Sequence, residues 1–191
     1  MLQRLALLCL VVLAVSCRPV LPPAIADEAA KTPRGQATVI FFTDFQCPFC
    51  RRTHAALEPL VDERKGHVRV VLKHVPLRRH PDARTAARAA ICAETLADDP
   101  MPYFHALTTA DDLSEQACAE LAASHGIDRD RFERCVRDPA TDERIERDKA
   151  TFDAVDGDGV PLLFVGRTRL EGAQSRSALE AAIDDAIARE K

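Results

Sequence analysis

The sequence predicts an α/β fold in which a β-α-β unit and a later β-β-α unit are separated by a block of helices. Three observations carry this prediction. An apolar run at 38–43 leads into a helical pattern and then into a β-branched run at 68–72. Residues 81–155 are helical in pattern throughout. Strand-type residues return only at 162–170, before a last amphipathic helix from about Ser175.

Length and composition indicate a single globular domain. Of the 191 residues, 47% are hydrophobic and 29% are charged, which is ordinary for such a domain. The formal net charge is −4, and residues 1–26 contain two arginines and no acidic residue, so the remainder carries about −6. A weakly acidic chain does not suggest a nucleic-acid partner. A monomer without a cofactor is expected.

The first residues have the features of an export signal. Arg4 precedes an apolar run at 5–15 that is too short to span a bilayer. Cleavage after an A-x-A motif would remove residues 1–26 as a signal peptide, whereas a lipoprotein-type signal would remove residues 1–16 and leave Cys17 as a lipidated first residue. An uncleaved anchor is the third alternative. Each places the folded part in the periplasm or another extracytoplasmic compartment, where disulfides persist.

The elements of the first half follow in order. Residues 27–37 have no periodicity and are predicted to be a linker. The strand at 38–43 is apolar on both faces, as in a buried strand. A helix follows from Pro48, which suits a first helical position because its missing N–H would be unpaired there, and it ends near Gly66. The strand at 68–72 is then expected to run parallel to the first.

The second half contains the insertion and the return to the sheet. Helices are predicted at 82–97, 101–107, 113–124, 129–136 and 142–155. Residues 156–191 then supply a strand at 162–165, a tight turn at Gly166-Arg167, a partner strand at 168–170 and the last helix. With residues 38–80 as one half and 156–191 as the other, this is the order of a thioredoxin fold with an inserted helical subdomain at 81–155.

Cys47-Pro48-Phe49-Cys50 lies where the first strand passes into the first helix. Two cysteines at this spacing in a βα context predict a redox-active dithiol or disulfide. A helix N-terminus lowers the pKa of a thiol, so Cys47 is expected to be the nucleophile. Cys50, one turn further and more buried, is expected to resolve the mixed disulfide.

A zinc site is the alternative interpretation of the two cysteines. It requires a second pair of ligands at similar spacing, but Cys92, Cys118 and Cys135 are isolated and no His-x-x-x-His pair is present. No metal site is therefore predicted.

Several polar residues near the motif are expected to be structural rather than catalytic. Arg51 and Arg52 are expected to be solvated on the helix surface, although they would add positive charge near the thiols. His74 ends the second strand and His80 precedes a helix.

Val160-Pro161 opens the strand at 162–165. Proline is tolerated at the first residue of a sheet strand. An ordinary trans turn proline is the alternative, but in thioredoxin folds a cis-proline loop faces the two cysteines and pairs with an extended substrate. A cis bond is therefore predicted here.

Four stretches carry a family resemblance: FFTDFQCPFC, VPLRRHPDARTAARAAICA, HGIDRDRFERCV and GVPLLFVGRTRLEGAQS. Together they resemble the DsbA-like thiol:disulfide oxidoreductases over residues 38–190. The resemblance implies an enzyme that donates the Cys47–Cys50 disulfide to unfolded or reduced secreted proteins. It also implies reoxidation by a membrane quinone-linked oxidase, and assigns Val160-Pro161 to the cis-proline pair.

Two positions depart from the family pattern. Many relatives have a buried acid six residues before the first cysteine, where this chain has Phe41, so a proton acceptor for Cys50 is missing. Asp44 would substitute for it in part, or would cap the turn instead. The strongest oxidants carry a histidine between the cysteines, and Phe49 cannot stabilise a thiolate in that way. We therefore expect a less depressed pKa for Cys47 and a less oxidising couple than in those relatives.

The remaining cysteines leave several pairings open. Some DsbA-like relatives have a second disulfide between places similar to Cys92 and Cys135, and the resemblance favours that pair. Cys118–Cys135, or three reduced thiols, are the alternatives.

Two other functions are compatible with the sequence. One is a disulfide reductase or isomerase of the same fold, although isomerases of this kind usually carry a dimerisation domain for which residues 27–37 leave no room. The other is a non-enzymatic lipoprotein that binds a metal or a peptide. His54, one turn beyond Cys50, keeps a copper carrier open as an alternative.

Overall fold

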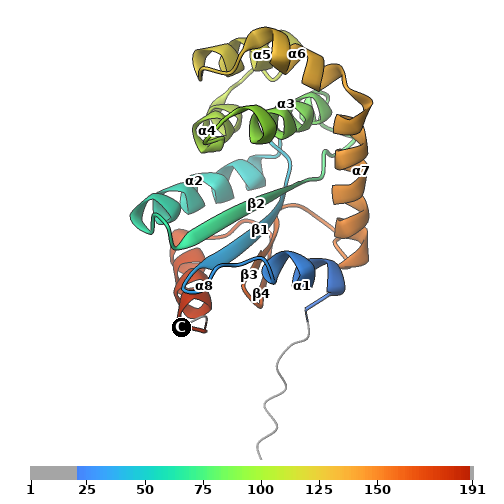
Figure 1. Ribbon diagram of the computed structural model, residues 1–191. Helices are drawn as coiled ribbons and strands as arrows, with labels where there is room; N and C mark the ends of the chain where they lie inside the picture. Colours follow the sequence, from blue (N-terminus) through green and yellow to red (C-terminus); the bar gives the residue numbers. More distant parts are fainter. Residues whose placement is uncertain (1–20, 190–191) are drawn as a thin grey trace, which may run out of the picture.

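The computed structural model describes residues 21–189, which form one four-stranded sheet with helices on both faces (Figure 1). The strands are β1 (Ala37–Thr43), β2 (Val68–His74), β3 (Leu162–Val165) and β4 (Thr168–Glu171). Their order is β2-β1-β3-β4. β1 pairs parallel with β2 and antiparallel with β3, and β3 pairs antiparallel with β4. The predicted thioredoxin fold is confirmed.

β1 lies inside the sheet between β2 and β3, and its residues alternate between two cores. Val39 and Phe41 face the larger core, which contains helices α2 (Pro48–Glu63) and α8 (Arg176–Arg189). Ile40 and Phe42 face a smaller core on the other side of the sheet. Because every residue of β1 is buried, the strand has the continuous apolar character that the sequence shows.

The predicted helical insertion is present and lies beyond α2, seen from the sheet (Figure 1). Its helices are α3 (Ala83–Leu96), α4 (Met101–Thr109), α5 (Glu115–Ser124), α6 (Arg129–Arg137) and α7 (Pro139–Ala154). α7 returns from the insertion past the β2 edge to the smaller core, where Phe152 packs near Phe42.

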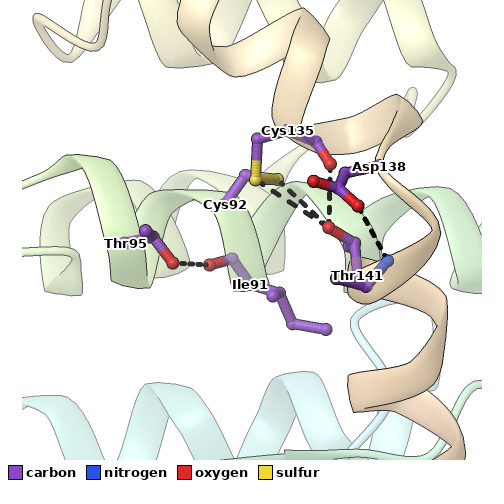
Figure 2. Close-up of a disulfide and its surroundings, with 7 residues drawn as sticks. Ile91, Cys92, Thr95, Cys135, Asp138 and Thr141 are labelled. Atoms are coloured by element: carbon purple, nitrogen blue, oxygen red, sulfur yellow. Dashed lines mark hydrogen bonds between the residues drawn. A yellow bond between two sulfur atoms is a disulfide. The ribbon is translucent and has the colours of Figure 1, made fainter.

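Cys92 and Cys135 form a disulfide between α3 and α6 (Figure 2). Their Cα atoms are 5.8 Å apart, and the bond closes a sequence separation of 43 residues. The pairing that the resemblance favours is confirmed. Cys118 is left as a buried free thiol, and burial raises its pKa to about 12.

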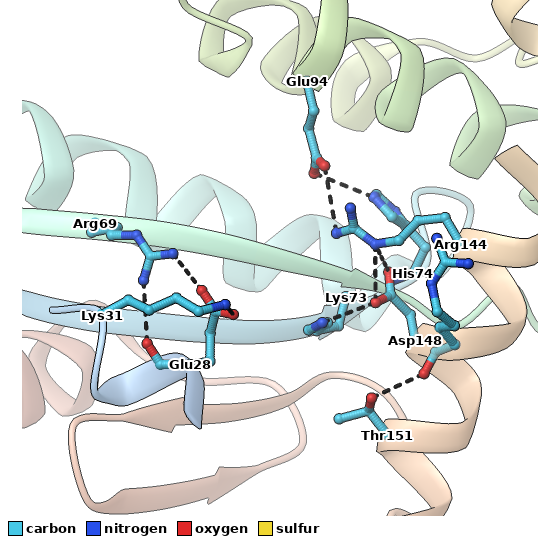
Figure 3. A network of polar contacts seen from close by, with 10 residues as sticks. Glu28, Lys31, Arg69, Lys73, His74, Glu94, Arg144, Asp148 and Thr151 are labelled. Carbon is cyan, nitrogen blue, oxygen red and sulfur yellow. Dashed lines mark hydrogen bonds and ion pairs between the residues drawn. The ribbon is translucent and has the colours of Figure 1, made fainter. Parts of the chain in front are cut away.

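A buried carboxylate fastens α7 to the edge strand (Figure 3). Asp148 accepts hydrogen bonds from the Lys73 ammonium at 3.0 Å and from the backbone N–H of His74 at 3.1 Å. The Arg144 guanidinium lies 3.2 Å from the same carboxylate. Since Asp148 has no exposed surface, these partners compensate for the loss of its hydration.

The predicted linker at 27–37 is wrong for its first residues. They belong to helix α1 (Pro23–Ala29), in which Ile25 is fully buried in the smaller core. Glu28 forms an ion pair with Arg69 of β2 (Figure 3). The helix was not predictable from periodicity because it has only one large apolar residue, and packing on the sheet stabilises it.

The predicted export signal and Cys17 lie outside the described residues. Among the helices of residues 21–189, none is long and apolar enough to cross a bilayer.

Candidate active site

The Cys-x-x-Cys motif lies at the N-terminus of α2, directly after β1. Cys47 is the N-cap residue, with extended backbone angles, and Pro48 takes the first helical position as predicted. Both cysteines are free, so the structure describes the dithiol form. The Cys47 sulfur therefore lies at the end of α2 where the first N–H groups have no partner within the helix.

This position lowers the pKa of Cys47 to about 5. The hydrogen bond from the Cys50 thiol contributes most, and the backbone N–H groups of Cys50 and Phe49 add to it. Burial and the Asp44 carboxylate act in the opposite direction. At neutral pH Cys47 is therefore a thiolate, the form that attacks disulfides.

The same contacts make Cys50 a weak acid. Burial raises the pKa of the Cys50 thiol, and its hydrogen bond to Cys47 raises it further. Donating that hydrogen bond stabilises the protonated form of Cys50 and the ionised form of Cys47. The two thiols thus have the unequal acidities that a nucleophile and a resolving cysteine need.

Asp44 caps the active-site turn. Its Oδ1 accepts hydrogen bonds from the backbone N–H of Gln46 at 2.7 Å and of Cys47 at 3.2 Å. Its Oδ2 accepts from the N–H of Leu77 at 2.9 Å and lies 2.8 Å from His80 Nδ1. Of the two roles expected for Asp44, the geometry favours the cap, and the contact with His80 helps to hold the carboxylate in place.

The Val160–Pro161 bond is cis, as predicted, and the loop faces the nucleophile. The Cys47 sulfur lies 3.9 Å from the Val160 carbonyl oxygen. Neither cysteine has exposed surface, but Cys50 lies deeper, since burial is the largest contribution to its raised pKa and only a secondary one for Cys47, as expected. Phe49, in contrast, is 49% exposed, the only large hydrophobic side chain that is so exposed within residues 21–189.

Arg51 is not the solvated residue that the sequence suggested. Its Nε donates to the Phe45 carbonyl at 2.7 Å and its Nη2 donates to the Ala110 carbonyl at 2.8 Å. Arg51 therefore ties the active-site turn to the insertion. Arg52 lies over the exposed Phe49 ring, 4.8 Å from its centroid.

His54 was considered as a copper ligand, but its surroundings do not fit that role. Its ring is buried, 4.5 Å from the Phe41 ring and 5.6 Å from that of Phe45, and its Nε2 lies 3.0 Å from the Thr43 hydroxyl. Within residues 21–189 no group of three or more His, Cys, Asp or Glu side chains is arranged to hold a metal. The sequence did not reveal the Thr43 contact, which depends on how α2 packs on β1.

Fold and site together define a dithiol centre on a thioredoxin scaffold with a helical insertion. The family model described as Thioredoxin matches residues 30–185, and the chain belongs to this family. Among structural neighbours, a thioredoxin-like oxidoreductase from Silicibacter pomeroyi is 28% identical, with a TM-score of 0.71 over 83% of this chain and 90% of the other.

Two further proteins are similar to this chain, one in structure and one in sequence. The thiol-disulfide exchange protein α-DsbA2 from Wolbachia pipientis shares the fold, with a TM-score of 0.69 and 21% identity over 78% of this chain and 81% of that one. A Na(+)/H(+) antiporter NhaA 1 from Mycolicibacterium gilvum is 29% identical over 87% of this chain. The chain spans only 27% of that antiporter's length. The family model therefore identifies the chain as a member of the thioredoxin family, and the neighbours share its fold.

Proposed function

We propose that this protein is an extracytoplasmic thiol:disulfide oxidoreductase that donates the Cys47–Cys50 disulfide to reduced secreted proteins as they fold. The observation that carries the proposal is the pair of unequal thiols beside the cis-proline loop. A substrate thiolate would attack Cys47, Cys50 would leave, and a second substrate thiol would then release the new disulfide from Cys47.

The depressed pKa of Cys47 supports the direction of transfer. A stabilised thiolate favours the dithiol form of the enzyme and therefore makes its disulfide a better oxidant. A pKa of about 5 lies between the values of about 7 for thioredoxin and about 3.5 for DsbA. We therefore propose net oxidation of substrates, with a membrane quinone-linked oxidase to restore the disulfide.

Two standard assays test this proposal. The oxidised enzyme is expected to form disulfides in reduced ribonuclease, and Cys47→Ala is expected to abolish that activity. Cys118→Ala is the matched control, since Cys118 is a buried free thiol on α5 whose hydrogen-bond partner is the Leu113 carbonyl. Oxidation that survives Cys47→Ala would contradict the assignment, and strong insulin reduction with no ribonuclease oxidation would favour the reductase alternative.

We further propose that the mature protein keeps helix α1 and is anchored through a lipidated Cys17. Cleavage after the A-x-A motif would remove Ile25, which is fully buried, and would leave only three residues of α1. Burial of an isoleucine is worth roughly 2 kcal/mol, which such cleavage would forfeit. Mass spectrometry of the exported protein is expected to find a lipidated Cys17, and a mature chain that begins at Asp27 would refute this.

The exposed Phe49 ring is proposed to contact apolar segments of unfolded substrates. Phe49→Ala is expected to raise the KM for a reduced protein and to leave the reaction with glutathione unchanged. An equal effect on both reactions would mean that Phe49 acts on the thiols instead.

A further inference from the structure

A buried hydroxyl on α2 joins the active-site helix to the loop between β4 and α8. Thr53 has no exposed surface, so its hydroxyl needs partners within the protein. It donates a hydrogen bond to the Phe49 carbonyl at 3.1 Å and accepts one from the backbone N–H of Gln174 at 3.2 Å. The first contact lies within α2, whereas the second reaches a residue 121 positions further along the chain.

The same loop holds the cis-proline. The Gly172 N–H donates a hydrogen bond to the Pro161 carbonyl at 2.9 Å. The Gln174 side-chain amide donates to the carbonyls of Glu171 and Gly172, at 2.8 and 2.9 Å, and so closes the loop on itself. Residues 171–175 are exposed apart from the half-buried Gln174, so these hydrogen bonds and the one to the α2 hydroxyl hold the loop in place.

A polar bridge therefore runs from the first turn of α2, through the Thr53 hydroxyl and the β4–α8 loop, to the cis-proline loop. It links two parts of the site that a peptide substrate must contact together. The Cys47 sulfur lies 3.9 Å from the Val160 carbonyl oxygen. A peptide joined to Cys47 by a disulfide therefore passes directly beside the cis-proline loop.

The other polar contacts between α2 and the C-terminal segment lie at the opposite end of the helix from the thiols. Arg64 pairs with Asp184, and Arg176 pairs with Glu63. These ion pairs include exposed side chains, so water and salt weaken them. At the end of α2 that carries the thiols, the buried hydroxyl of Thr53 is what joins the helix to the loop.

We propose that Thr53 is a positioning residue that sets the placement of α2 against the cis-proline loop and thereby favours extended peptide substrates, an inference that rests on the proposed function. Its hydrogen bonds go to the backbone of Phe49 and from that of Gln174, so it acts through the main chain rather than on the sulfurs. A peptide must place its sulfur at Cys47 and its backbone beside Val160 at once. A small thiol such as glutathione needs little more than access to Cys47.

Steady-state oxidation of a short reduced peptide with two cysteines tests this role, with reduced glutathione as the second substrate. Thr53→Val keeps the shape of the side chain and removes the hydroxyl. The net contribution of a hydrogen bond corresponds to about twofold to tenfold in an equilibrium constant. We therefore expect the KM for the peptide to rise at least about threefold, with kcat nearly unchanged. The rate constant for glutathione is expected to stay the same, and Thr53→Ser is expected to restore the peptide KM.

Further measurements separate positioning from a change at the thiols. The redox potential and the pH midpoint of Cys47 alkylation are expected to be the same in Thr53→Val and in the wild type. In a Phe49→Ala background, Thr53→Val is expected to raise the peptide KM by the same factor, because the bridge uses the Phe49 carbonyl and not its ring. Thr108→Val removes another buried hydroxyl, bonded to the His105 carbonyl of its own helix, and is the matched control with an unchanged KM.

The outcomes are distinct from those for the function itself. If the wild-type disulfide does not oxidise the peptide, the proposed function fails. If it does, and folded Thr53→Val keeps a peptide KM within about 1.5-fold of the wild-type value, the positioning role is refuted. Equal slowing of peptide and glutathione, a shifted potential, or an effect that vanishes in the Phe49→Ala background would refute it as well. Circular dichroism confirms folding, and Thr53→Ala replaces Thr53→Val if that variant does not fold.

Discussion

At the scale of single residues, the position of each thiol at the start of α2 determines its acidity. Cys47 accepts hydrogen bonds from the Cys50 thiol and from two backbone N–H groups, whereas Cys50 is enclosed and donates. The residue type does not explain this difference in acidity, since both side chains are cysteines. It arises because one sulfur lies at the unpaired end of the helix and the other lies one turn inside.

The ionisation of Cys47 is expected to determine how the rate of its alkylation changes with pH. Iodoacetamide alkylation of the reduced protein is expected to accelerate as the pH rises through about 5 and to level off by neutral pH. Cys50→Ala is expected to move this midpoint upward, because the Cys50 hydrogen bond is the largest contribution to the shift. A wild-type midpoint of about 7 or above would contradict the described geometry.

The same shift gives the sign of a stability effect. The pKa of Cys47 is lower in the folded protein than in the unfolded chain, where it is near 8.5. Its ionisation therefore stabilises the folded dithiol form fully above about pH 8.5, and this stabilisation is lost as the pH falls to about 5.

At the scale of elements, a disulfide fastens α3 to α6 within the insertion, and a buried ion pair and the contacts of Arg51 join the insertion to the rest of the fold. Removing the disulfide with Cys92→Ser and Cys135→Ser is expected to cost about 4 kcal/mol of unfolding free energy, from the loop entropy of 43 residues. Urea unfolding measures this loss. Because the disulfide lies between α3 and α6, the folded variant is expected to keep its ability to oxidise reduced ribonuclease. A selective loss of that activity in the folded variant would contradict this.

The contact between α7 and β2 offers a second test at this scale. Asp148→Ala leaves Lys73 and the His74 N–H without their partner, so we expect a loss of about 3 kcal/mol in unfolding free energy. Glu146→Ala on the same helix is the matched control. Its contacts with Arg84 and Lys149 are on the surface, where a pair contributes less than about 1 kcal/mol. Equal losses of unfolding free energy in the two variants would contradict the larger contribution expected from the buried Asp148 carboxylate.

At the scale of the whole molecule, local patterns were enough to predict the strands and the position of the thiols, since the strand at 38–43 and the proline that starts α2 each obey rules that involve only neighbouring residues. The cis bond at Val160-Pro161 followed instead from the order of elements, which is that of a thioredoxin fold. Features that join distant segments were not predictable. Arg51 reaches Ala110, 59 residues away, and the contact between His54 and Thr43 exists only because α2 packs against the end of β1.

Helix α1 is another feature that local sequence patterns did not predict. Ile25 gives no periodic pattern, yet it completes the smaller core together with Phe42 and Phe164. A stretch with one apolar residue resembles a linker until its tertiary contacts are known. The folded unit therefore begins earlier than the sequence indicated.

The redox potential of the Cys47/Cys50 couple, measured by equilibration with glutathione buffers, tests the proposed function most directly. A partly stabilised Cys47 thiolate and a phenylalanine between the cysteines lead us to expect a potential between about −270 mV, the value for thioredoxin, and about −120 mV, the value for DsbA. A value at or below about −270 mV would contradict the proposed donation of disulfides. A value as high as about −120 mV would contradict the limits set by Phe49 and Phe41.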